Sequence, residues 1–224
     1  MSLAPRQLVL ALDHRESFAR EDFLAGPPNA AALALIERWP DWPSLMMALV
    51  GPEGSGKTHL ASIWARISGA RVLSAKLLGQ TDLPAALATG ALVVEDLAPR
   101  SLDERALFHL LNLAREEGAF LLLTARSAPA AFPVGLRDLA SRLRSIPVVT
   151  LAAPDDALLR ALIVKLAADR QLAVDEPLVS FLANRIERSF AAAKDAVERI
   201  DREGMRLHRP VTRALAAELF RENP

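Results

Sequence analysis

The sequence predicts an α/β protein in which a five-stranded parallel P-loop sheet domain precedes a small all-helical domain. Five short apolar runs alternate with helical patterns between residues 45 and 151, and no strand pattern follows Pro154. A glycine-rich loop lies directly between the first apolar run and the next helical pattern. Short apolar strands that alternate with helices are typical of a parallel sheet covered on both faces.

The elements follow in a regular order. Residues 1–28 are expected to be irregular and to end at the turn signal Gly26-Pro27-Pro28, after which Asn29 offers a helix N-cap. Prolines at 40 and 43 then prevent the helix from continuing. The expected strands are 45–50, 71–75, 91–95, 119–124 and 146–151. The expected helices are 29–38, 57–68, 82–88, 103–116, 135–143, 155–169, 176–187, 190–207 and 212–221. These patterns divide the chain into a tail (1–28), a P-loop α/β domain (29–153) and a helical lid domain (154–224).

The composition argues against several kinds of function. Lys plus Arg and Asp plus Glu each total 27, so the formal net charge is zero and direct sequence-specific DNA binding is not expected. The absence of cysteine excludes disulfides and cysteine-ligated zinc. The N-terminus lacks a secretory pattern, and no apolar stretch approaches the roughly 20 residues that span a bilayer. We therefore expect a cytoplasmic protein with no membrane partner.

The segment Gly51–Thr58 matches the phosphate-binding loop G-x-x-x-x-G-K-[ST] at every position. Its predicted context is also correct, since it follows a strand and begins a helix. The backbone N–H groups of such a loop surround an anion, and the helix N-terminus adds its positive dipole. We expect ADP or ATP with Mg²⁺ to bind here, Lys57 contacting the phosphates and Thr58 the metal. The contributing residues are Gly51, Pro52, Glu53, Gly54, Ser55, Gly56, Lys57 and Thr58.

Two carboxylates end the predicted strand 91–95. Glu95 and Asp96 follow the apolar run Ala91–Val94. P-loop enzymes hold Mg²⁺ with a carboxylate on a neighbouring strand, and a second acid there can orient or deprotonate the attacking water. Glu95 is thus predicted as a metal ligand with Thr58, and Glu95 and Asp96 are both predicted as catalytic residues. The alternative is a pair of surface acids at a strand end. Such sites usually carry Asp at the metal position, so the longer Glu95 predicts weak intrinsic hydrolysis.

Several short sequence segments, taken in their order along nearly the whole chain, resemble the motifs of the DnaA branch of the AAA+ ATPases. The segment 22–29 is similar to the one that packs on the adenine in that family, which implies a binding role for Phe23 and Leu24. The segment 121–129 resembles the sensor 1 strand, which implies a catalytic role for Thr124. That family usually has Asn, Asp or Ser in this box, so Thr124 or Ser127 must serve, and Arg126 is unusual there.

The same resemblance implies roles for two arginines. Residues 139–143 resemble the box with the arginine finger, which implies that role for Arg142. Residues 186–188 lie where the sensor 2 arginine is expected, which implies that role for Arg188. The alternative for both is an ordinary solvated helix arginine. Because an arginine finger acts at a neighbour's site, the resemblance leaves homo-oligomer formation open.

The tail carries a short peptide pattern. Residues 7–12, with the sequence QLVLAL, resemble the motif by which bacterial proteins dock on the DNA sliding clamp. A glutamine bonds at a pocket rim while spaced leucines fill an apolar groove, as in other peptide-recognition modes. The implied clamp-binding residues are Gln7, Leu8, Leu10 and Leu12. The alternative is a strand or staple that packs on its own domain.

Together these resemblances imply a regulator of replication initiation. Such a protein binds adenine nucleotide, docks on the clamp and promotes hydrolysis of DnaA-bound ATP, which limits re-initiation. The alternative is a stand-alone DnaA-like ATPase or helicase loader that acts by its own ATP turnover. A pure adaptor without a nucleotide role conflicts with the intact phosphate loop. A small-molecule kinase would leave the arginine boxes unexplained.

Overall fold

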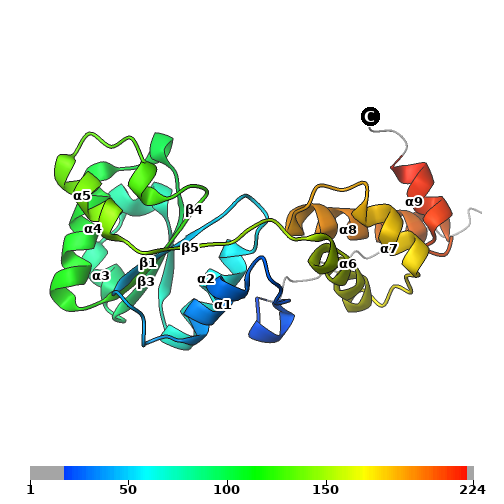
Figure 1. The fold of residues 1–224 in the computed structure, drawn as a ribbon, viewed down its shortest axis with the longest axis horizontal. Coiled ribbons are helices and arrows are strands. Elements are labelled where there is room, and N and C mark those ends of the chain that lie inside the picture. The colour runs from blue at the N-terminus through cyan, green and yellow to red at the C-terminus, as the bar shows by residue number, and fades with distance from the viewer. Residues whose placement is uncertain (1–17, 221–224) are drawn as a thin grey trace, which may run out of the picture.

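The protein consists of two bodies arranged along its long axis (Figure 1). The structure is a computed structural model that describes residues 18–220. The sheet and its helices form one body, and helices α6 to α9 form the other. Within the described residues, no helix is both long and apolar enough to cross a membrane.

The sheet has five parallel strands, as the sequence predicts. They are β1 (Met46–Val50), β2 (Arg71–Ser74), β3 (Ala91–Leu97), β4 (Phe120–Ala125) and β5 (Val148–Thr150). Their order in the sheet is β2-β3-β4-β1-β5, so the connections that follow β1 and β4 run in opposite directions and a switch point lies between these two strands. In open parallel sheets the carboxyl ends of the strands beside such a switch point form the ligand-binding edge.

Helices cover both faces of the sheet because side chains alternate along each strand. Met47 and Leu49 of β1 pack with helices α1 (Ala30–Glu37) and α2 (Lys57–Ser68). Ala48 and Val50 pack on the opposite face. That face is covered by α3 (Leu83–Leu87), α4 (Glu104–Glu117) and α5 (Arg137–Ser145), together with the 3₁₀ turn η2 (Ala75–Gln80).

An aromatic cluster closes the first face of the sheet. Trp42 and Trp64 stack with their ring centroids 4.9 Å apart, and Trp39 contacts Phe120 edge to face. The indole nitrogen of Trp42 donates to the Leu35 carbonyl at 2.7 Å. Trp39 and Trp42 therefore pack against this face of the sheet.

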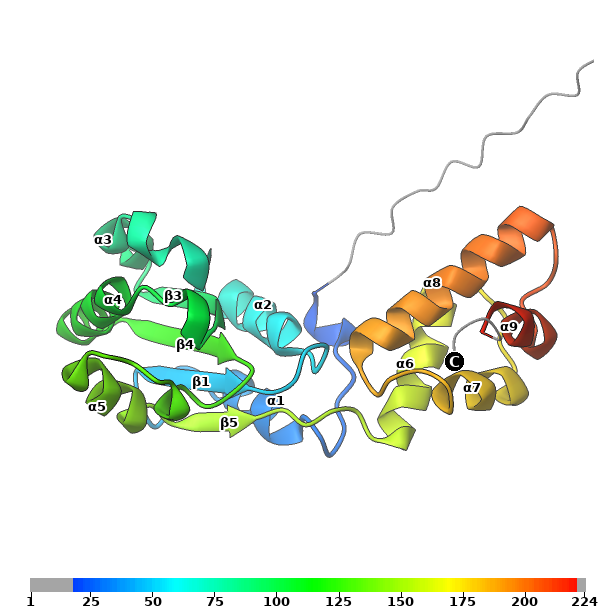
Figure 2. The same ribbon diagram turned by 90° about the horizontal axis from the view of Figure 1, so that it is seen from above.

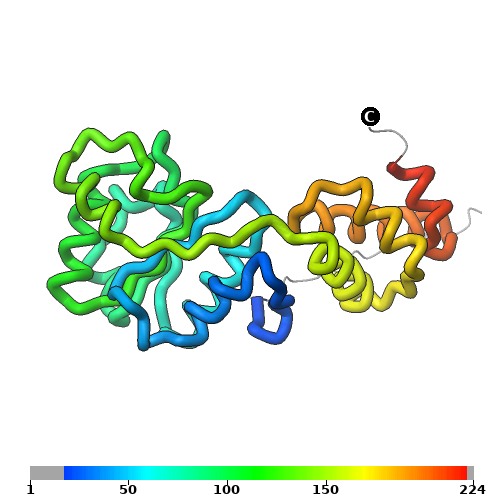
Figure 3. The backbone as a smooth tube through the Cα atoms, viewed as in Figure 1, coloured from blue at the N-terminus to red at the C-terminus, as the bar shows by residue number. Residues whose placement is uncertain are grey.

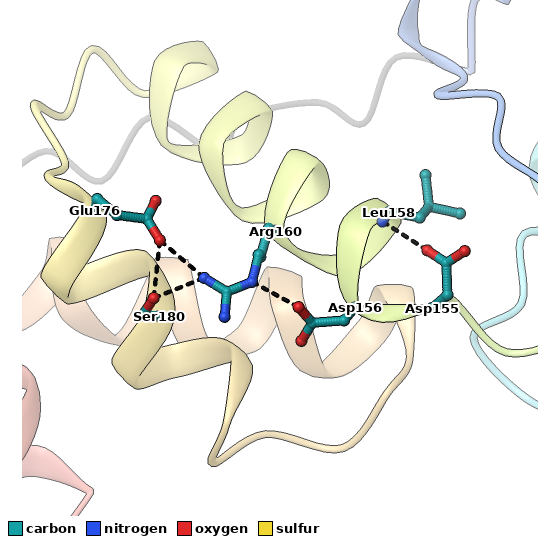
Figure 4. A network of polar contacts seen from close by, with 6 residues as sticks. All are labelled: Asp155, Asp156, Leu158, Arg160, Glu176 and Ser180. Atoms are coloured by element: carbon teal, nitrogen blue, oxygen red, sulfur yellow. Dashed lines mark hydrogen bonds and ion pairs between the residues drawn. The ribbon is translucent and has the colours of Figure 1, made fainter.

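The helical body is stabilised by its own core and by capped helices. It contains α6 (Asp156–Asp169), α7 (Glu176–Ala183), α8 (Phe190–Leu207) and α9 (Arg213–Leu219). Each begins after an N-cap whose side chain accepts a backbone hydrogen bond: Asp155, Asp175, Ser189 and Thr212. Such caps satisfy otherwise unpaired amides. Arg160 joins α6 to α7 by contacting Asp156, Glu176 and Ser180 (Figure 4).

Most predicted bounds lie within two residues of the observed ones, and three local predictions differ from the structure by more than that or in kind. Helix α7 ends at Ala183 rather than at residue 187, so Arg188 lies in a loop. Asn29 stands at the N-cap position of α1, but its side chain instead accepts from the Gly26 amide at 2.9 Å and donates to Leu24. The segment before it, expected to be irregular, contains a 3₁₀ turn, η1 (Arg20–Asp22).

The chain crosses from one body to the other directly after β5 (Figure 3). Three polar contacts also connect segments where the two bodies meet. Ala152 N–H donates to Pro28 at 3.0 Å, and Lys165 of α6 bonds Asp22 at 2.9 Å. Phe190, the first residue of α8, donates its N–H to the Gly54 carbonyl at 2.8 Å. As Figure 2 shows, the amino end of α8 points toward the loop that precedes α2.

Candidate phosphate-binding site

A cleft of about 1070 Å³ lies where the two bodies meet. The phosphate loop and the carboxyl ends of β3 and β4 line it from the sheet body, and α6 and α8 line it from the helical body. The segment 18–29 contributes Phe23 and Leu24. The cleft therefore brings together residues from four of the predicted functional segments, although these are far apart in sequence. The segments are 22–29, 51–58, 91–96 and 121–129.

The phosphate loop has the backbone that its glycines permit. Gly54 and Gly56 have φ angles of +69° and +96°, in the left-handed region that other residues rarely adopt. Gly56 is also the N-cap of α2, so the loop leads directly into the helix N-terminus. The Ser55 hydroxyl is buried in this loop without a hydrogen-bond partner among the described residues. A polar ligand in the loop fits such an orphaned group.

Lys57 is held in place by the loop that it serves. Its ammonium donates to the carbonyls of Gly51 at 2.8 Å and Pro52 at 2.7 Å, and the residue is only 8% exposed. An ammonium has three donor hydrogens, so one more is available to an anion. Burial lowers the pKa of Lys57, an effect that the charge of Asp96 opposes. A phosphate in the loop would favour the charged form of Lys57.

A bulge brings two consecutive carboxylates to the same site. In a regular strand, neighbouring residues face opposite sides of the sheet. Here the pairing of β3 with β4 shifts between Val94 and Leu97, and Asp96 has a φ of 59°. The Asp96 N–H donates at 3.0 Å to the hydroxyl of Thr124, which is 1% exposed. Thr124 therefore anchors the turn that directs Asp96 into the cleft.

Glu95 lies beside Thr58, as a shared metal site requires. Burial raises the pKa of Glu95, and repulsion from Asp96 adds to this, while a hydrogen bond from Thr58 opposes it. The Glu95 Oε1 atom is buried without a hydrogen-bond partner among the described residues. A bound cation would satisfy that oxygen and stabilise the charged carboxylate.

The donor set fits Mg²⁺ in a nucleotide site. No cluster of three or more His, Cys, Asp or Glu suited to a metal occurs within residues 18–220. Glu95 and Thr58 would thus supply two oxygen ligands. Mg²⁺ in nucleotide sites characteristically takes one or two protein groups, with phosphate oxygens and water completing the shell.

The predicted adenine side of the cleft contains a residue that sequence reasoning missed. Phe23 is 7% exposed and meets the His59 ring edge to face, with centroids 5.2 Å apart. His59, on α2, also bonds the Ala19 carbonyl at 2.9 Å through Nε2. His59 follows the phosphate loop directly, but nothing in the sequence indicates that segment 18–24 folds back onto it.

The two predicted arginines lie outside the cleft. Arg142, on α5, places its guanidinium 5.2 Å from the centroid of the Phe108 ring. Arg188 is exposed in the loop before α8, and neither residue lines the cleft. The helical body instead presents Lys194 of α8 to it. Their roles as finger and sensor remain predictions.

The predicted clamp-binding residues Gln7, Leu8, Leu10 and Leu12 lie outside the described residues. Their role remains a prediction drawn from the sequence.

Sequence comparisons connect the chain with replication initiators. It is 25% identical to the chromosomal replication initiator protein DnaA of Thermomicrobium roseum, over 90% of this chain and 49% of that protein. It is 22% identical to DnaA 2 of Chlamydia caviae, over 79% of this chain and 44% of that protein. The chain thus spans about half the length of the curated relatives it matches. No protein-family model matches it.

Structural comparisons agree in fold. Domain III of DnaA from Thermotoga maritima superimposes with a TM-score of 0.74 at 18% identity, covering 92% of this chain and 98% of that one. AMPPCP-bound DnaA from Aquifex aeolicus gives 0.66 at 20% identity, covering 82% and 65%. The R170A variant of Thermotoga maritima RuvB gives 0.70 at 19% identity, covering 90% and 70%.

The sheet with its phosphate loop, followed by a helical domain, is a P-loop fold of the same class as the AAA+ domains that it matches. Within that class the chain is DnaA-like, both in sequence and in fold.

Proposed function

We propose that this protein binds ADP or ATP together with Mg²⁺ in the cleft. The observation that carries the proposal is the phosphate loop, in which Gly54, Gly56 and Lys57 adopt the geometry of an anion site at the start of α2. The AMPPCP-bound state of a DnaA with the same fold supports an adenine nucleotide. Phe23 and Leu24 would pack on the base from the segment before α1.

Each residue of the site has a distinct task in this proposal. Lys57 donates to the terminal phosphates, and the loop amides hold the others. Thr58 and Glu95 would hold Mg²⁺, which when bound neutralises phosphate charge. Asp96 orients the attacking water by accepting its proton in a hydrogen bond, and Thr124 holds Asp96 at that angle.

We further propose that the protein acts as a regulator of replication initiation similar to Hda, the DnaA-related inactivator. In this role it docks on the sliding clamp through Gln7, Leu8, Leu10 and Leu12 and contacts ATP-bound DnaA. Arg142 then stabilises charge on the γ-phosphate at that interface. Two observations support this role. The chain resembles DnaA in sequence and fold, and Arg142 lies outside the nucleotide cleft of this protein.

The competing proposal is a stand-alone DnaA-like ATPase or helicase loader. The observation in its favour is that Glu95 and Asp96 both reach the phosphate site and that Thr124 anchors Asp96. A regulator that acts on DnaA-bound ATP does not need this arrangement around its own nucleotide. Strong basal hydrolysis in the absence of DnaA would favour it.

Nucleotide binding is tested by titration calorimetry with ADP and with AMPPCP in the presence of Mg²⁺. The wild type should bind both, and Lys57→Ala should lose measurable affinity for both. Lys76→Ala, which removes a lysine that lines the same cleft outside the loop, is the matched control. An unchanged affinity in Lys57→Ala would overturn the nucleotide proposal.

The regulatory role is tested by measuring ATP hydrolysis by DnaA with and without this protein, in the presence of clamp loaded on DNA. Stimulation should require the clamp, residues 1–12 and Arg142, while Arg142→Ala keeps nucleotide affinity. Arg144→Ala, two residues away on α5 and exposed, is the matched control. No stimulation, combined with strong hydrolysis by this protein alone, would favour the stand-alone ATPase.

A further inference from the structure

Arg126 enters the cleft from a firmly placed backbone. It follows Ala125, the last residue of β4, which pairs with Val50 of β1. The Ala125 carbonyl also accepts the N–H of Gly51, the first residue of the phosphate loop, at 3.2 Å. The backbone beside Arg126 is therefore hydrogen-bonded to the start of the phosphate loop. Arg126 itself lines the cleft.

The partner of Arg126 is an acid within the phosphate loop itself. The Arg126 guanidinium lies 2.5 Å from the carboxylate of Glu53, the third residue of the loop. Both side chains are about three-quarters exposed, at 72% and 75%. Exposed ion pairs of this kind are weak, so a competing anion can replace Glu53.

The charge of Arg126 also reaches the centre of the loop. Burial is the main cause that lowers the pKa of Lys57, and the positive charge of Arg126 lowers it further. Glu53 acts in the opposite direction. Lys57 and Arg126 also both line the cleft in which the phosphates are expected to bind. Guanidinium groups are well suited to this, since their fork matches phosphate oxygens.

We propose that Glu53 and Arg126 form a switch that distinguishes a nucleoside triphosphate from a diphosphate. With a diphosphate in the cleft, Arg126 remains in its ion pair with Glu53. With a triphosphate, the terminal phosphate binds Arg126 and displaces Glu53, because a bidentate contact with the more highly charged phosphate is stronger than the exposed ion pair with Glu53. Arg126 is then a specificity-determining residue of the nucleotide site, and Glu53 sets how much triphosphate is needed to engage it. This inference rests on the proposed nucleotide binding.

The test measures affinity for AMPPCP and for ADP, with Mg²⁺, by titration calorimetry. Arg126→Ala should weaken AMPPCP binding by about 10-fold to 100-fold, the range for a hydrogen-bonded charged group, and change ADP binding by less than about threefold. Glu53→Gln should strengthen AMPPCP binding by about two- to fivefold, because the weak competing pair is gone. In the Arg126→Ala background, Glu53→Gln should have no further selective effect.

Arg115→Ala is the matched control, since Arg115 is an exposed arginine of α4 outside the cleft. It should leave both affinities unchanged. Equal effects of Arg126→Ala on both ligands, or no effect of Glu53→Gln, would overturn the switch. If Lys57→Ala loses both ligands while Arg126→Ala shows no selectivity, the switch alone is wrong. If the wild type binds neither ligand, the switch and the proposed nucleotide binding both fail.

Discussion

The substitution Thr124→Val isolates the hydrogen bond that holds the second carboxylate. Thr124 is 1% exposed, and its hydroxyl accepts the Asp96 N–H at 3.0 Å. Valine keeps the shape but removes the acceptor, which leaves the backbone N–H of Asp96 unpaired in a residue whose own φ is 59°. An unsatisfied donor of this kind costs about 1–3 kcal/mol. Because Asp96 itself is exposed and water can reach part of the turn, we expect the free energy of unfolding to fall by about 1–2 kcal/mol.

The assay is urea unfolding followed by far-ultraviolet circular dichroism, with the slope of the transition checked against the wild type. Thermal unfolding should show a decrease of about 2–4 °C for each kcal/mol in a chain of this size. Thr150→Val makes the same chemical change at an exposed position of β5 and should stay within about 0.5 kcal/mol of the wild type.

Adding Asp96→Gly to Thr124→Val provides a second check. Glycine adopts a positive φ without the penalty that a side chain brings, so the double variant should recover about 1 kcal/mol. If Thr124→Val is as stable as Thr150→Val, the hydrogen bond does not hold the turn. The positioning role assigned to Thr124 would then be refuted.

Three further predictions follow from the cleft. Gly54→Ala would place a methyl group 2.9 Å from Ser189 Cβ at a φ of +69°, so it should abolish nucleotide binding and increase protease cleavage between the two bodies. In metal-free buffer, Glu95→Gln should stabilise the protein increasingly as the pH rises above about 4.5. Burial raises the pKa of Glu95, so the native state retains this proton longer than the unfolded chain, and ionisation at higher pH costs stability. A pH-independent difference would contradict this. Lys194→Ala should weaken AMPPCP binding more than Arg188→Ala does, since of the two only Lys194 lines the cleft; the reverse order in calorimetry would support Arg188 as the sensor.

The sheet and the phosphate loop could be predicted because their signals are local. Each strand is a short apolar run, and the residues that form the loop are consecutive. The alternation of Met47, Ala48, Leu49 and Val50 between two covered faces explains why these runs are apolar throughout rather than alternating. Parallel pairing then brings the carboxyl ends of β1, β3 and β4 to one edge without further information.

The remaining features depend on contacts between distant segments. Helix α7 stops at Ala183 although residues 184–187 are compatible with a helix. The loop that follows instead carries Ser189 to the N-cap of α8 and brings Phe190 to Gly54. The pair of Glu53 with Arg126 is likewise separated by most of the sheet domain in sequence. Local propensity contains no information on such pairs.

The aromatic cluster on the first face of the sheet has an optical consequence. The chain has three tryptophans and no tyrosine, and Trp39, Trp42 and Trp64 all lie in the sheet body. Intrinsic fluorescence therefore arises from that body, while circular dichroism at 222 nm also reports the helices of the other body. Superimposable unfolding curves from the two signals would mean that the bodies unfold as one unit. A dichroism change before any emission change would give the separate stability of the helical body, without a label.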